Sequence, residues 1–189
     1  MKPRRVRFVS RLLALLLPLI VVVPLRASEA IVVHSARAEV QGNVIEFTVH
    51  AQYAADEATS EALAAGATVD VDVQAMVERQ NEYWFDSVVL KRNLRRELSW
   101  NVLSQRYVLK NPASGEQETF ATLEEALVAA GTVENWSVEM DSGLDPDATY
   151  EVSVRARLRR GRVPTALRTL TFWTRYWNRS EWYTWTLPR

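Results

Sequence analysis

The sequence predicts a mainly β protein: an antiparallel two-layer β-sandwich, immunoglobulin-like in outline, with two short helices near 55–65 and 122–130. Proline, glycine and Asx residues mark turns between short segments, as expected of such folds. Apolar and polar residues also alternate, which is the pattern of strands with one buried and one solvated face. The three clearest alternating segments are 44–53, 68–78 and 150–159.

Residues 1–30 have the pattern of an export signal: a basic head, a short apolar block and small residues after it. The apolar block, 12–25, is 14 residues long, whereas a membrane-spanning helix needs roughly 20. We therefore expect an exported, periplasmic protein whose signal peptide is cleaved after Ala27 or Ala30. In the alternative, an uncleaved signal anchors the protein in the inner membrane through residues 12–25. We expect membrane contact only in that case.

The remaining chain, 31–189, is expected to be a single β-rich domain. It holds 17 basic and 22 acidic side chains, a net charge of −5, although the whole chain is neutral. A mildly acidic protein is a poor candidate for binding nucleic acid. The sequence contains no cysteine, which excludes disulfides, cysteine zinc sites and cysteine nucleophiles.

The first predicted hairpin joins strands 32–40 and 44–53 through the Gly42-Asn43 turn. A two-residue loop sets Ala38 opposite Phe47, which places the apolar residues of both strands on one face. The same register sets His34 opposite Ala51 and His50 opposite Ser35, so the two histidines lie on opposite faces. We therefore expect no histidine metal pair, and we predict no metal site and no cofactor.

Two helices interrupt the strands. The first spans 55–65, with Gly66 as its C-terminal stop. The second spans 122–130, begins with a capping box formed by Thr122 and Glu125, and is closed by Gly131. Less regular strands are predicted at 87–100, 104–110, 117–121, 132–139, 167–174 and 181–187.

Arg155, Arg157 and Arg159 project from one face of the predicted strand 150–159. They could form a stripe for an acidic partner, a phosphate group or anionic lipid. Alternatively, they could pair with acids of a neighbouring strand, and Asp70, Asp72 and Glu78 could supply those acids.

Aromatic residues are concentrated near the C-terminus, and Trp177, Trp182 and Trp185 are the candidates among them for a ligand platform. Tryptophans also fill cores and cover sheet edges. On a regular strand, Trp182 and Trp185 face opposite ways, so one can be buried while the other lines a groove.

Several stretches, taken together in their order and spacing, resemble a family of exported proteobacterial proteins catalogued as domain of unknown function 4390. The stretches are Tyr83-Trp84-Phe85-Asp86, 98–109, 120–127 ahead of Gly131, Tyr150-Glu151-Val152 with Arg155 and Leu158, Trp177-Asn178, and Trp182. The resemblance spans about 35 to 187. It implies a signal-bearing, single-domain, β-rich protein often encoded beside a membrane sensor histidine kinase. It carries over no catalytic residue.

These observations favour a non-catalytic binding module of the bacterial envelope with a protein partner, and the resemblance implies a role as an accessory to that kinase. The predicted binding surface comprises Arg155, Arg157, Arg159, Trp177, Trp182 and Trp185. An alternative is a carbohydrate or small-ligand binder that uses the C-terminal tryptophans. A hydrolase is a third hypothesis, although the sequence has no nucleophile elbow and no H-E-x-x-H motif.

Overall fold

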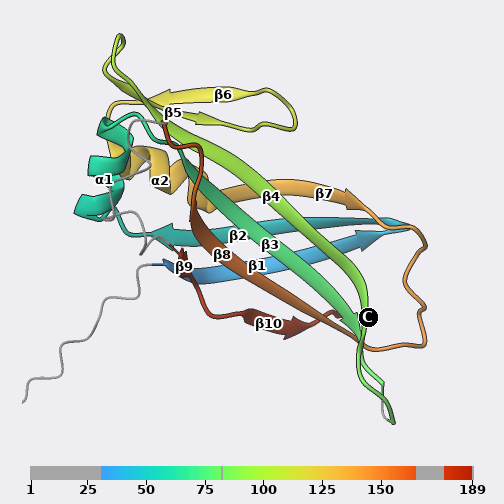
Figure 1. Cartoon of the computed structure of the whole chain (residues 1–189). Helices are drawn as coiled ribbons and strands as arrows, with labels where there is room; N and C mark the ends of the chain where they lie inside the picture. The colour runs from blue at the N-terminus through green and yellow to red at the C-terminus, as the bar shows by residue number, and fades with distance from the viewer. Residues whose placement is uncertain (1–30, 82, 165–176, 189) are drawn as a thin grey trace, which may run out of the picture.

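A computed structural model describes residues 31–81, 83–164 and 177–188 of the chain. Within these residues the fold is mainly β, and two antiparallel sheets carry two short helices (Figure 1). The smaller sheet has the order β1-β2-β7, with bounds β1 (Ile31–Gln41), β2 (Val44–Tyr53) and β7 (Thr132–Glu139). The predicted two-layer antiparallel architecture is confirmed.

The larger sheet has the order β10-β8-β3-β4-β5-β6. Its strands are β3 (Val69–Arg79), β4 (Ser87–Asn101), β5 (Arg106–Lys110), β6 (Gln117–Phe120), β8 (Tyr150–Arg160) and β10 (Tyr183–Thr186). A short strand, β9 (Trp177–Arg179), pairs with the same edge of β8 as β10 does. Ser180 follows β9 in the chain and continues the pairing with β8. Its backbone N–H donates to Ala156 O, and its hydroxyl accepts from the Ala156 N–H.

One apolar core lies between the sheets, built by the predicted alternation. The inward residues of β3 and β8 are buried, and they pack in one cluster with Ile45, Phe47 and Val49 of β2. The second helix, α2 (Leu123–Gly131), adds Leu127 to this cluster. Apart from Met76, the outward side chains of β3 and β8 are polar, so the alternation that forms the core also arranges charged groups on the opposite face of the large sheet.

The capping box predicted for the second helix is confirmed, whereas the first helix begins at Glu57 and not at residue 55. In α2, the Thr122 hydroxyl accepts from the Glu125 N–H at 3.2 Å, and the Glu125 carboxylate accepts from the Thr122 N–H at 3.3 Å. The first helix, α1 (Glu57–Ala64), is followed by Gly66 at φ +84°, a left-handed conformation that favours glycine.

Gly131 has a different role from the predicted one. Gly131 was predicted to follow the helix as its stop signal, but it is the last residue within α2. A Cβ atom at this position would lie 1.9 Å from the backbone oxygen of Ala51 in β2. Glycine is therefore required because the chain passes here from α2 into β7, whose first residue pairs with β2, and the Ala51 backbone lies too close for any side chain.

The register of the first hairpin is confirmed from the turn to Ser35, which pairs with His50. Beyond that point the prediction is wrong by one residue. A bulge at His34 shifts the pairing, so that Val33 rather than His34 lies opposite Ala51. Both histidines are exposed, and His34 Nε2 lies 2.8 Å from Gln52 Oε1.

The predicted strands near the C-terminus agree with the structure only in part. The predicted strand 167–174 lies outside the described residues. The predicted strand 181–187 is shorter and runs from Tyr183 to Thr186, whereas β9 was not predicted. In the part of the chain that the structure describes, no helix is long and apolar enough to cross a membrane.

Candidate functional site

The candidate site lies on the outer face of the large sheet, where β8 runs beside β3. Arg155, Arg157 and Arg159 alternate along β8 with buried Ala156 and Leu158, so all three project outward. On β3 they face Gln74, Asp72 and Asp70 in that order. The strand register therefore sets two of the three arginines opposite a carboxylate.

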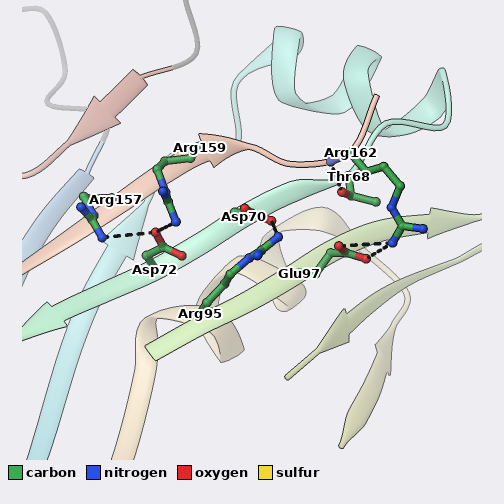
Figure 2. A network of polar contacts seen from close by, with 8 residues as sticks. All are labelled: Thr68, Asp70, Asp72, Arg95, Glu97, Arg157, Arg159 and Arg162. Carbon is green, nitrogen blue, oxygen red and sulfur yellow. Dashed lines mark hydrogen bonds and ion pairs between the residues drawn. The ribbon is translucent and has the colours of Figure 1, made fainter. Parts of the chain in front are cut away.

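Asp72 is the most buried charged side chain of this face, with no exposed area. Its Oδ2 accepts from Arg157 Nη2 at 3.4 Å and contacts Arg159 Nη2 (Figure 2). Burial raises the pKa of the Asp72 carboxyl above its ordinary value, against the opposing effect of Arg159 and Arg157. Both arginines thus share a single carboxylate that is itself poorly solvated.

Two further ion pairs occupy the same face. Asp70 accepts from Arg95 Nη2 of β4 at 3.0 Å, and this hydrogen bond raises the pKa of Arg95. Glu97 of β4 lies 3.1 Å from Arg162, next to the end of β8 (Figure 2). The predicted pairing of β8 arginines with acids of β3 is therefore found for Asp72, whereas Asp70 pairs with Arg95 of β4.

Arg155 differs from its two neighbours because it faces no carboxylate. Its Nε donates to the neutral Gln74 Oε1 at 2.8 Å, and its guanidinium lies 4.3 Å from the centre of the Trp182 ring. Burial lowers the pKa of Arg155, and the positive charges of Arg157 and Arg179 lower it further. Arg155 is thus a fixed cation beside other cations.

A half-open cavity of about 440 Å³ lies over these residues. We call it the arginine hollow, and it is lined by Arg155, Arg157, Leu158, Arg159, Asn178 and Arg179. β9 supplies Asn178 and Arg179, because Arg157 pairs with Arg179 across the two strands. Among the described residues, the four guanidinium groups have one carboxylate partner between them, Asp72. The hollow is therefore a cationic site suited to an anionic group.

The three predicted tryptophans are separated by the structure. Trp182 is half-buried and stacks with Arg155 beside the hollow. Trp185 lies opposite Val152 and packs against the core. The backbone of Trp177 pairs with Arg159, and its side chain lies outside the described residues. Of the predicted surface, the structure therefore brings together the three arginines and Trp182.

Two features of the molecule were not predicted as functional. Arg179 was not singled out, because no local sequence pattern determines the position of β9 beside β8. Tyr83, Trp84 and Phe85 entered only as part of a resemblance. These three aromatics lie in the loop between β3 and β4 and are 84 to 95% exposed. Three consecutive aromatics between two predicted strands were the available signal.

The fold and the site define a class: a two-layer antiparallel β domain with a cationic hollow on its outer face. The chain belongs to the family described as Domain of unknown function (DUF4390), whose model matches residues 28–186. The resemblance found in the sequence is thereby confirmed at the level of the family. No curated protein and no solved structure matches the chain.

Proposed function

We propose that the protein is an exported, non-catalytic binding module that holds an acidic segment of a protein partner in the arginine hollow. The observation that carries this proposal is the charge imbalance of the hollow: Arg155, Arg157, Arg159 and Arg179 line it, and within the described residues Asp72 is the one carboxylate that pairs with any of them. An anion that enters the hollow reduces repulsion between these cations and gains charge-assisted hydrogen bonds.

The geometry favours recognition because the cations are held in place before a ligand arrives. Arg155 is fixed from two sides, by the Gln74 side chain and by the Trp182 ring. Arg157 is fixed by Asp72 and by Asn93, whose Oδ1 accepts from its Nη2 at 3.0 Å. Fixed guanidinium groups lose little side-chain entropy on binding a carboxylate. A volume of about 440 Å³ has room for an acidic side chain and its neighbours.

The cellular setting of the proposal comes from the sequence. The signal-like residues 1–30 support export to the periplasm of a proteobacterial host. The family resemblance suggests one partner, the outer domain of a membrane sensor histidine kinase. An acidic segment of such a domain is the chemistry that the arginine hollow fits.

Binding to a fluorescent glutamate-rich peptide, followed by anisotropy, tests the proposal. We expect the double variant Arg155→Gln/Arg179→Gln to bind roughly fivefold more weakly than the wild type or worse, since each partly exposed charge contributes up to about 1 kcal/mol. Added salt should weaken wild-type binding for the same reason. Arg37→Gln is the matched control, because Arg37 lies on β1 and pairs with Glu39. Equal affinities of the wild type and the double variant would refute the proposal.

The carbohydrate alternative depends on a free aromatic platform. Arg155 covers Trp182, and Trp185 packs against the core. These contacts favour the acidic ligand over a sugar. Tryptophan fluorescence measured across a panel of neutral glycans distinguishes the two: a saturable change with a glycan would support the alternative.

A further inference from the structure

The loop between β3 and β4 presents large apolar side chains to solvent. Tyr83 is 88% exposed, Trp84 84% and Phe85 95%. We call these three residues the aromatic tip, and Figure 1 shows their hairpin extending beyond the rest of the two sheets. Single exposed apolar residues are ordinary on protein surfaces, but three consecutive aromatics at a protruding end mark an interaction site.

The loop is held in shape by polar contacts rather than by its aromatic side chains. The Asn81 side-chain amide donates to Phe85 O at 3.0 Å and to Ser87 Oγ at 3.3 Å. The Asn81 backbone N–H donates to Asp86 Oδ1 at 3.1 Å. These contacts close the loop without any contribution from the aromatic side chains. The three rings can therefore face outward while the loop keeps its conformation.

The apolar surface surrounds the hairpin end. Val88 and Val89 follow the loop in β4 and are 55 and 39% exposed. Consecutive strand residues point to opposite faces of a sheet, so apolar side chains lie on both sides of the hairpin. A groove on a protein contacts one side of such a hairpin, whereas a lipid bilayer contacts all sides.

The residues also suit the interfacial region of a bilayer. Tryptophan and tyrosine are enriched at the headgroup level, because their rings are apolar while their N–H and O–H groups remain hydrated. The exposed cations Lys91 and Arg92 follow the tip by about six residues, roughly 20 Å along an extended strand. At that distance they can reach headgroups while the aromatic tip lies at the boundary with the acyl chains.

We propose that the aromatic tip is a membrane-contact site that inserts into the interfacial region of a phospholipid bilayer. This surface shares no residue with the arginine hollow or with the sequence segment 1–30, so its test does not depend on the proposed function. Asp86 lies beside the tip, so attraction to anionic lipid is not the driving force. Zwitterionic bilayers are expected to suffice.

The test uses quenching of tryptophan fluorescence in the full chain by vesicles of phosphatidylcholine brominated on its acyl chains. Residues 1–30 contain no tryptophan, so their insertion adds no signal of its own. Vesicles should quench the wild type, and Trp84→Phe should remove more than half of that quenching. Trp100→Phe is the matched control, because Trp100 lies near the opposite end of β4 and packs against Tyr107. Its quenching should equal that of the wild type.

Two results would overturn the proposal. In one, vesicles leave wild-type fluorescence unchanged while envelope protein fractions change it, which assigns the tip to a protein partner. In the other, Trp84→Phe and Trp100→Phe are quenched alike. Trp84 is exposed, so both outcomes can be read on folded protein, and thermal unfolding of each variant verifies this.

Discussion

Replacing Gly131 with alanine is expected to lower the free energy of unfolding by about 3 kcal/mol. The new Cβ atom would lie 1.9 Å from the backbone oxygen of Ala51 and 3.0 Å from its carbonyl carbon. Ala51 is paired with Val33 of β1, and backbone atoms of a paired strand cannot move aside alone. Helix α2 must therefore shift away from β2, which loosens the packing of Leu127 against the core.

Urea unfolding followed by circular dichroism measures this loss. Gly143→Ala is the matched control, because a Cβ atom there would lie 3.4 Å from the backbone oxygen of Gly42 and 4.0 Å from its carbonyl carbon, which is close to ordinary contact. We expect that control to stay within about 0.5 kcal/mol of the wild type. A Gly131→Ala protein as stable as the control would show that the close approach of α2 and β2 is not present in solution.

The second large effect is expected at Asp72, where the variant Asp72→Asn should strengthen binding of the glutamate-rich peptide by on the order of tenfold. Asp72 is the carboxylate that offsets the charge of Arg157 and Arg159 in the arginine hollow. An amide of the same shape leaves both cations available to the ligand. The released guanidinium side chains are 17 and 34% exposed, so they stay partly hydrated and the protein should remain folded.

The same carboxyl gives the site a pH dependence. Because burial raises its pKa, Asp72 takes up a proton more readily in the folded than in the unfolded protein. Its contribution to stability is therefore present at low pH and is lost as the pH rises through the raised pKa. For binding, protonation acts like the asparagine substitution, so the affinity of the wild type should approach that of Asp72→Asn as the pH falls through the raised pKa of Asp72.

Anisotropy titrations of the wild type and Asp72→Asn at several pH values test both parts of this expectation. The peptide's own carboxylates titrate in both proteins, so the readout is the ratio of the two affinities at each pH. The ratio should approach one as Asp72 is protonated. A ratio that is constant with pH, or weaker binding by Asp72→Asn, would contradict the assigned role of Asp72.

Local patterns in the sequence predicted most of the fold. Alternation located β2, β3 and β8, and the Gly42-Asn43 turn determined a register that holds as far as Ser35. The bulge at His34 was not predictable from that turn, because a bulge is a response to packing further along the strand. Gly131 shows the same limit, since its close neighbour, Ala51, is distant in the sequence.

The candidate site was predictable only in part, for a similar reason. Strand periodicity placed Arg155, Arg157 and Arg159 on one face, and the acids of β3 were named as their possible partners. Which acid each arginine contacts depends on the β3–β8 register, which spans more than seventy residues of sequence. The contribution of β9, with Arg179, depends on a short strand whose position no local pattern determines.

A crosslinking measurement tests the central claim most directly, and the absence of cysteine from the sequence makes it possible. Asn178→Cys places a single thiol at the arginine hollow, and Asn101→Cys places one at the C-terminal end of β4, outside the lining of the hollow. After a thiol-linked photocrosslinker is attached and illuminated in envelope fractions, the account predicts a discrete protein adduct from position 178 alone. That adduct should disappear when Arg155→Gln/Arg179→Gln is added. The same adducts from both positions, or an adduct that survives the loss of both arginines, would contradict the claim that the arginine hollow holds a protein partner.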